Sequence, residues 1–315
     1  MKILQVTAPR EFVIREVPVP QPGAGEVLLR IQAVTTCPQW DLHLRHNEPM
    51  FVGHQFTYPY MVGQPGHEAT GVIEQVGEGV TGLQAGDRVS AWRDAGHDVP
   101  GCYAQFVVHK ADNVIRVPEG LPHSALASLE LAMCIATVFR QLVKMDVIRG
   151  RVFGVSGLGP AGLIAIQMAK AEGAATVFGV DPLASRRERA LHLGAEGCFS
   201  PGDMQIPQAG LETSVDCVGS NASVAALMDN TSDILALFGV QREDYIYQPR
   251  HKRLTILGYK GHLRESAEYA IDFMRQGKLN LGALVSHQMP LEQYSAGIDL
   301  LETQQAIKVL FLPWE

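Results

Sequence analysis

The chain has 315 residues, which is long enough for two domains that each bury a hydrophobic core. Hydrophobic residues make up 46% and charged residues 19%, as in ordinary globular proteins. The formal net charge of −7 argues against a nucleic-acid partner, which needs a basic face, and gives no reason to expect attachment to an anionic membrane.

The cysteines and the N-terminal segment predict a cytoplasmic protein. The five cysteines are scattered along the chain, and an odd, sparse set argues against a disulfide framework. The N-terminus alternates apolar and polar residues, unlike the apolar core of a signal peptide. The longest apolar stretch, residues 126–139, is too short to span a bilayer and contains Glu130.

The first 120 residues predict a β-rich domain. Short β-like segments separated by turns rich in Gly and Pro are found at residues 26–31, 69–76, 88–92 and 103–108. A longer helical pattern follows at residues 121–144.

From residue 151 strands and helices alternate. Strand patterns at residues 152–156, 176–181 and 214–219 alternate with helical patterns at 163–174 and 185–195. Such short connections imply right-handed crossovers and a parallel sheet, so this part predicts an α/β, doubly wound fold. The remaining patterns are a strand at 254–257, helices at 266–277 and 291–301, and a strand at 307–312.

A glycine-rich turn joins the first strand and helix of the α/β part. Its residues are Gly157, Leu158, Gly159, Pro160, Ala161 and Gly162. In a dinucleotide-binding turn these glycines permit the tight bend, the approach of the pyrophosphate and close packing of helix on strand. The context of strand, turn and helix favours dinucleotide binding over a turn that binds nothing.

Asp181 ends the second strand at about the expected interval of ~20 residues and favours NAD. A carboxylate there accepts hydrogen bonds from the ribose diol and repels a 2′-phosphate. Arg186 and Arg187 follow nearby and could recruit that phosphate, or form a charged surface. NADP is therefore the less favoured cofactor.

Three residues of the β-rich part have the chemistry of zinc ligands: Cys37, His67 and Glu130. A catalytic zinc uses three protein ligands and one open position. Ligands this far apart in sequence are weak evidence by themselves, because a lone cysteine is more often a small core residue.

Several motifs in chain order resemble the medium-chain zinc-dependent alcohol and polyol dehydrogenases. They are AVTTC at 33–37 with Asp41 and His43, GHEATGVI at 66–73, GDRV at 86–89, SLE at 128–130, the glycine turn, Asp181, DCVG at 216–219 with Val218, and IKV at 307–309. The resemblance extends over essentially the whole chain.

This resemblance implies a GroES-like catalytic domain at residues 1–130 and 262–315 and a Rossmann NAD-binding domain at 131–261. It implies Cys37, His67 and Glu130 as zinc ligands and Glu68 as a supporting residue or exchangeable fourth ligand. It also implies that Asp41 orients the imidazole of His67 and that Lys308 approaches the cofactor pyrophosphate. Relatives are commonly dimers or tetramers, so the resemblance suggests a homodimer or homotetramer.

Two departures from the family pattern limit this interpretation. Relatives usually carry a lobe with four close cysteines for a structural zinc, whereas residues 92–102 contain one, so we predict a catalytic zinc alone. Relatives also place a Ser or Thr between the first cysteine and its aspartate, but residues 37–41 contain no hydroxyl. His43 is then either a proton relay or an ordinary hydrogen-bonded histidine. Trp40 either shapes an apolar substrate pocket or packs in the core.

The implied reaction is hydride transfer between NAD and an alcohol or polyol, or its carbonyl product, with zinc as a Lewis acid. Two alternatives remain open. One is a zinc-free quinone or enone reductase of the same superfamily, and the other is a non-catalytic NAD-binding protein.

Overall fold

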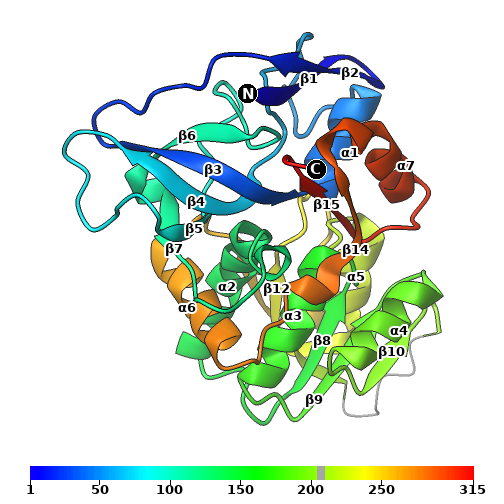
Figure 1. Ribbon diagram of the computed structural model, residues 1–315. Coiled ribbons are helices and arrows are strands. Elements are labelled where there is room, and N and C mark those ends of the chain that lie inside the picture. The colour runs from blue at the N-terminus through cyan, green and yellow to red at the C-terminus, as the bar shows by residue number, and fades with distance from the viewer. Residues whose placement is uncertain (204–209) are drawn as a thin grey trace. The chain divides into compact units, whose positions relative to one another are not determined.

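A computed structural model of the chain describes residues 1–203 and 210–315. It divides into two compact units, Met1–Leu131 with Leu281–Glu315 and Ala132–Asn280. Each unit is built around a sheet of its own (Figure 1). The first unit therefore contains both ends of the described chain.

The first unit is β-rich, as the sequence predicts. The strand order of its main sheet is β14-β15-β3-β4-β5-β7, and β6 pairs with the N-terminal half of β3, residues 26–30. The strands are β3 (Glu26–Thr35), β4 (Glu68–Val76), β5 (Arg88–Ala91), β6 (Phe106–Lys110), β7 (Val114–Arg116), β14 (Val285–Pro290) and β15 (Lys308–Leu312). A separate hairpin is formed by β1 (Lys2–Ala8) and β2 (Glu11–Glu16).

The register of this sheet aligns three strand ends. Thr35 at the end of β3 pairs with Glu68 at the start of β4, and with Leu310 of β15. Residues that follow β3, precede β4 and begin β15 therefore lie at one edge. Helix α1 (Pro38–His46) begins two residues after β3, and α7 (Tyr294–Glu302) packs against α1 and β15.

The second unit is a parallel sheet in the order β10-β9-β8-β11-β12-β13. The order reverses at β8, which confirms the predicted doubly wound Rossmann arrangement. The strands are β8 (Val152–Ser156), β9 (Thr176–Val180), β10 (Gly197–Phe199), β11 (Leu211–Asp216), β12 (Thr231–Leu237) and β13 (Thr255–Gly258).

The helices of this unit pack on its strands. In Figure 1, α3 (Pro160–Ala171) lies along β8 and β9, and α4 (Ala184–His192) lies along β9 and β10. Helix α5 (Asn221–Asn230) packs on β11 and β12. Helix α6 (Arg264–Arg275) buries one mostly apolar face. Helix α3 buries every residue from Gly162 to Ala169, because it is apolar on all sides.

Helix α2 (Leu129–Lys144) begins at the end of the first unit. Together with the preceding turn it forms the stretch His123–Lys144, which is long and apolar enough to cross a membrane. However, 78% of its most apolar window is buried inside the protein. That burial is typical of a core helix. Short 3₁₀ helices complete the described chain: η1 (Ala111–Asn113), η2 (His123–Ala125), η3 (Pro249–His251), η4 (Gly282–Leu284) and η5 (Leu291–Gln293).

The second boundary between the units differs from the predicted one. The sequence places it between residues 261 and 262, whereas the compact units meet at Asn280 and Leu281. The side chain of Gln167 in α3 explains this: its amide oxygen accepts from the Asn280 N–H at 2.8 Å and its Nε2 donates to the Asn280 carbonyl at 3.4 Å. These bonds hold the segment after α6 against the Rossmann unit.

Candidate metal centre and cofactor-binding turn

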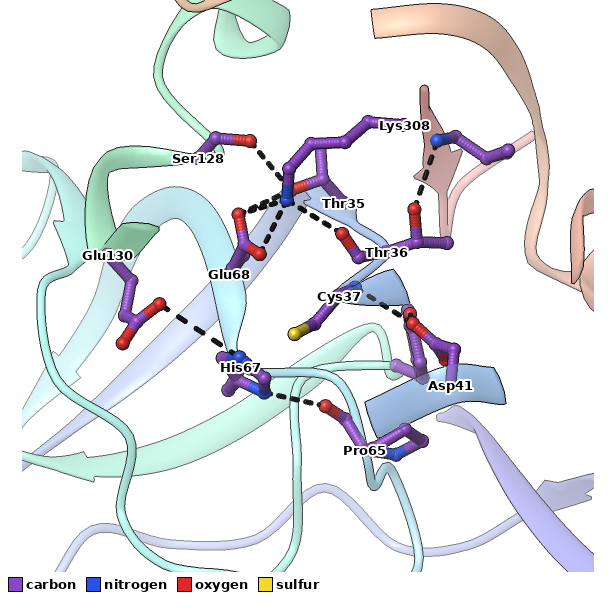
Figure 2. Close-up of polar contacts among 12 residues, drawn as sticks. Thr35, Thr36, Cys37, Asp41, Pro65, His67, Glu68, Ser128, Glu130 and Lys308 are labelled. Carbon is purple, nitrogen blue, oxygen red and sulfur yellow. Dashed lines mark hydrogen bonds and ion pairs between the residues drawn. The ribbon is translucent and has the colours of Figure 1, made fainter. Parts of the chain in front are cut away.

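Three potential metal ligands converge at the edge of the first sheet. Cys37, His67 and Glu68 each offer one ligand atom, and these atoms lie within 4.8 Å of one another. Figure 2 shows the sulfur of Cys37 pointing toward the His67 imidazole, with the Glu68 carboxylate beside them. The strand register produces this convergence, because Cys37 follows β3 whereas His67 and Glu68 stand at the start of β4.

Glu130, the third predicted ligand, lies next to this group. Its Oε2 is 3.9 Å from the Nε2 atom of His67, and both side chains are buried (Figure 2). Glu130 stands in the first turn of α2. The structure thus brings two of the predicted ligands, Cys37 and His67, together with Glu68, and places the third predicted ligand, Glu130, beside His67.

The orientation of His67 suits a ligand. Its Nδ1 lies 2.8 Å from the carbonyl oxygen of Pro65 (Figure 2). A carbonyl can only accept, so Nδ1 is protonated, and in the neutral imidazole Nε2 then has a free lone pair. The resemblance implies that Asp41 orients this imidazole, but the imidazole N–H donates to the Pro65 carbonyl instead.

The group of side chains attracts positive charge. Burial alone would lower the pKa of His67, but the charge of Cys37, its hydrogen bond, and the charges of Glu130 and Glu68 raise that pKa well above its ordinary value. A thiolate, an imidazole and carboxylates form the donor set that zinc prefers. The residues present therefore fit a zinc ion.

Asp41 holds the segment that carries Cys37. Its fully buried carboxylate accepts a hydrogen bond from the Cys37 N–H at 2.8 Å and from the hydroxyls of Tyr103 and Tyr294. Burial raises the pKa of Asp41 to about 6, against the opposing effect of these hydrogen bonds. Asp41 therefore ties the start of α1 to β-domain residues and to α7, which fixes the position of the thiol.

Lys308 is fully buried and pairs with Glu68. Its Nζ donates to both carboxylate oxygens of Glu68 at 2.5 Å and to the Thr36 carbonyl at 2.7 Å. Thr35 also donates to Glu68, at 3.2 Å. The predicted contact of Lys308 with a cofactor pyrophosphate stays a prediction, because the described contacts of its amine are with Glu68 and Thr36.

Other predicted residues lie as follows. The Nδ1 atom of His43 lies 3.2 and 3.1 Å from the carbonyl oxygens of Glu48 and Pro49. Its role as a proton relay stays a prediction. Trp40 stacks on His97, with ring centroids 3.5 Å apart and an angle of 23°, and meets Phe56 edge-on.

Sequence reasoning missed Thr35, Ser128 and His97. The Thr35 and Ser128 hydroxyls are 3.0 Å apart, and Thr35 contacts Glu68. The hydroxyls absent from residues 37–41 thus stand immediately before Cys37, at Thr35 and Thr36. Burial and the charge of His67 lower the pKa of His97 to about 4, so its imidazole is neutral at pH 7.

The second unit forms the predicted glycine turn between β8 and α3. Gly157 has φ +84°, and a Cβ at Gly162 would lie 1.8 Å from the Gly157 carbonyl oxygen, so neither position tolerates a side chain. Gly159 is the N-cap of α3 and Pro160 its first residue, which leaves backbone N–H groups at the helix start. This geometry suits a pyrophosphate.

Asp181 stands beside this turn at the end of β9. Its carboxylate accepts from the Leu158 N–H at 2.8 Å and the Leu183 N–H at 2.9 Å, and Arg186 Nη1 lies 3.5 Å from it. Val218 is 42% exposed, and one of its methyl groups lies so close to Gly157 that a Cβ added there would be 2.6 Å from it. Arg187 donates instead to the Asp181 and Pro182 carbonyls.

Two family models match the chain. Residues 23–119 match an alcohol dehydrogenase GroES-like domain, and residues 160–275 match a zinc-binding dehydrogenase. The first match confirms that the β-rich unit is GroES-like. The first region contains Cys37, His67 and Glu68, and the second contains Pro160, Gly162 and Asp181.

Known proteins resemble the chain over nearly its full length. It is 27% identical over 340 residues to an L-threonine 3-dehydrogenase of Bacillus subtilis, covering 96% of this chain and 95% of that protein. It is 23% identical over 343 residues to a sorbitol dehydrogenase of Halalkalibacterium halodurans, covering 96% of each. Galactitol-1-phosphate dehydrogenase of Escherichia coli shares the fold with a TM-score of 0.85 at 23% identity, over 99% of this chain and 100% of that one.

The buried Lys308–Glu68 pair gives a test of the site's charge balance. Lys308→Met leaves the Glu68 charge buried without its cation, which should destabilise the metal-free protein by about 3–5 kcal/mol. Adding Glu68→Gln to Lys308→Met should recover much of that loss. Denaturant unfolding followed by tryptophan fluorescence measures both effects.

Lys2→Met is the matched control, because Lys2 forms an exposed pair with Glu292, also at 2.5 Å. Its loss should change stability far less than the loss of Lys308 does, because solvent screens an exposed pair. A Lys308→Met variant as stable as Lys2→Met, or one that Glu68→Gln does not stabilise, would show that Lys308 does not balance the charge of Glu68.

Proposed function

From the premise that this chain belongs to the medium-chain zinc-dependent alcohol and polyol dehydrogenase family, we propose that Cys37, His67 and Glu130 hold one catalytic zinc ion. Glu68 is then an exchangeable fourth ligand or a support for the other three. The enzyme is an NAD-linked dehydrogenase of alcohols or polyols. The observation that carries the proposal is the convergence of a thiol, a correctly oriented imidazole and two carboxylates at one sheet edge.

Zinc held by these residues supplies a Lewis acid, which makes an alcohol hydroxyl easier to deprotonate near neutral pH. The protein supports that chemistry through the groups around the ligands. The Pro65 carbonyl keeps the imidazole of His67 in the tautomer whose Nε2 can bind a cation. Asp41 fixes the Cys37 backbone, and Lys308 balances the charge of Glu68.

We propose His43 as the residue that accepts the alcohol proton. Its Nδ1 faces the carbonyl oxygens of Glu48 and Pro49, so that nitrogen carries the proton of the neutral imidazole. Nε2 is then the basic atom. An imidazole nitrogen can both accept and release a proton, which suits a proton relay.

NAD is the redox partner that the glycine turn suits, and it supplies the acceptor for hydride. Gly157, Leu158, Gly159, Pro160 and Gly162 form the turn, and Asp181 stands at its side. A carboxylate at this position disfavours a 2′-phosphate, although Arg186 lies next to it. We therefore propose NAD over NADP, and fluorescence titration with both reduced cofactors decides between them; tighter NADPH binding contradicts the proposal.

We also propose a homodimer or homotetramer that acts in the cytoplasm on a small alcohol or carbonyl substrate. Light scattering of purified protein measures the assembly. A structural zinc is not part of the proposal, because residues 92–102 contain one cysteine, Cys102.

Replacement of Cys37 tests the metal proposal. Purified wild-type protein should contain about one zinc per chain, because one open three-ligand site is proposed. Cys37→Ser should lose the zinc and all measurable alcohol oxidation, yet bind NADH nearly as the wild type does, since the cofactor turn belongs to the other unit. Metal analysis, a panel of alcohols and NADH titration measure the three properties.

Cys198→Ser is the matched control, because Cys198 is a half-buried cysteine of β10 in the Rossmann unit. It should keep both zinc and turnover. Turnover without zinc, or turnover that survives Cys37→Ser, contradicts the proposal and favours the zinc-free quinone or enone reductase. Zinc without turnover on any alcohol favours the non-catalytic NAD-binding protein.

A further inference from the structure

A second group of potential metal ligands lies on helix α2 and the segment that precedes α6. Glu130, Cys134 and His262 each offer one ligand atom, and these atoms lie within 4.8 Å of one another. The ligand atoms of the first group, at the sheet edge, lie within the same distance of one another. The two groups are thus comparably compact, although the proposed zinc site uses neither Cys134 nor His262.

Helix α2 carries two of these ligands on one face. Glu130 and Cys134 stand four positions apart in the helix, which places their side chains one turn apart on the same side. Both side chains are buried. Cys134 and His262 belong to the second unit, Ala132–Asn280, and Glu130 shares its helix with Cys134. The position of the group is therefore determined by one helix and one unit.

His262 is positioned by contacts between α2 and the start of α6. It lies in the segment that joins β13 to α6. Arg140 of α2 donates to the Ser266 hydroxyl of α6 at 3.1 Å and lies 3.9 Å from the Glu265 carboxylate. These contacts hold the segment that carries His262 against the helix that carries Cys134.

The ligand chemistry of this second group selects soft divalent cations. A thiolate, an imidazole and a carboxylate are donors that zinc and cobalt accept, whereas magnesium and calcium prefer oxygen ligands. In a tetrahedral zinc site with bonds of about 2.0–2.3 Å, ligand atoms lie about 3.3–3.8 Å apart. The three atoms therefore need to approach one another by no more than about 1.5 Å to bind an ion.

Glu130 connects this group to the first one. Its Oε2 lies 3.9 Å from the Nε2 atom of His67, and Figure 2 shows its other carboxylate oxygen pointing away from that imidazole. A carboxylate has lone pairs on both oxygens, so it can bind two cations at once. Two cations that share one carboxylate repel each other, and each weakens the binding of the other. Purified protein should therefore keep metal at the first site alone.

We propose that Glu130, Cys134 and His262 bind a second soft divalent cation, of the zinc and cobalt class, at a site that shares Glu130 with the first. This second site is separate from the proposed function. It needs no ion at the first site, because Cys134 and His262 take no part there. Metal added beyond the first equivalent fills it.

Titration of the Cys37→Ser protein with cobalt(II) tests the second site by itself. A thiolate bound to cobalt gives a charge-transfer absorption band, which the first site cannot give once its thiol is removed. The band should saturate at one cobalt per chain. Adding Cys134→Ser should abolish the band and weaken cobalt binding by about a hundredfold, since loss of an outer partner of a ligand already costs about 10–100-fold. Millimolar magnesium should not displace the cobalt.

His262→Phe, also made in the Cys37→Ser protein, tests the imidazole ligand at a half-buried position where a substitution is tolerated more easily than at Cys134. It removes both nitrogens and should weaken cobalt binding about tenfold or more. Cys198→Ser is the matched control, because Cys198 is a half-buried cysteine of the same unit, and it should leave the band unchanged. Absence of the band in Cys37→Ser, its loss in the control, its survival without Cys134, or unchanged affinity in His262→Phe overturns the inference.

The shared carboxylate is tested by comparing two proteins. Wild-type protein loaded with one zinc per chain should bind cobalt about tenfold more weakly than Cys37→Ser does, because the first cation repels the second and competes for Glu130. Equal affinity in the two proteins would show that the sites do not share a ligand. Wild-type protein that contains no zinc and oxidises no alcohol would instead refute the proposed function, while the cobalt titration of Cys37→Ser still decides the second site.

Discussion

The candidate metal site depends on the neutralisation of buried negative charge. Cys37, Glu68, Glu130 and Asp41 bring a thiol and three carboxylates into one region from which water is largely excluded. Buried charges are costly unless opposite charges or hydrogen bonds compensate them. Here Lys308 compensates Glu68, two tyrosine hydroxyls and a backbone N–H compensate Asp41, and His67 lies against Cys37 and Glu130. The remaining excess of negative charge is what a divalent cation would balance.

The topology of the first unit makes this compensation possible. Lys308 and Glu68 are 240 positions apart in the chain, and they meet because β15 pairs with β3, which in turn pairs with β4. Both ends of the chain are therefore needed to complete one site. Asp41 adds a second long-range link through Tyr294 of α7, 253 positions away. Such links fix the ligands before any metal binds, which is the preorganisation that metal catalysis requires.

Local chemistry was the part of the molecule that the sequence could predict. The strand, glycine turn and helix at residues 152–171 obey rules that operate within a few positions, and the structure reproduces them, with Asp181 beside the turn. The convergence of Cys37, His67 and Glu130 rested on family resemblance, because spacing along a chain does not determine spacing in a β-rich fold. Two results lay beyond such reasoning. The hydrogen bond that orients His67 is accepted by a backbone carbonyl, which has no residue signature, and His97 is placed by a loop whose path no pattern encodes.

In the proposed site a single zinc ion is bound by one sulfur together with nitrogen and oxygen atoms. X-ray absorption at the zinc edge of active protein measures that ligand set most directly. The account predicts one sulfur neighbour at about 2.3 Å and the remaining neighbours, nitrogen or oxygen, at about 2.0–2.2 Å. A shell of four sulfur atoms, or a zinc ion with no sulfur neighbour, would contradict it.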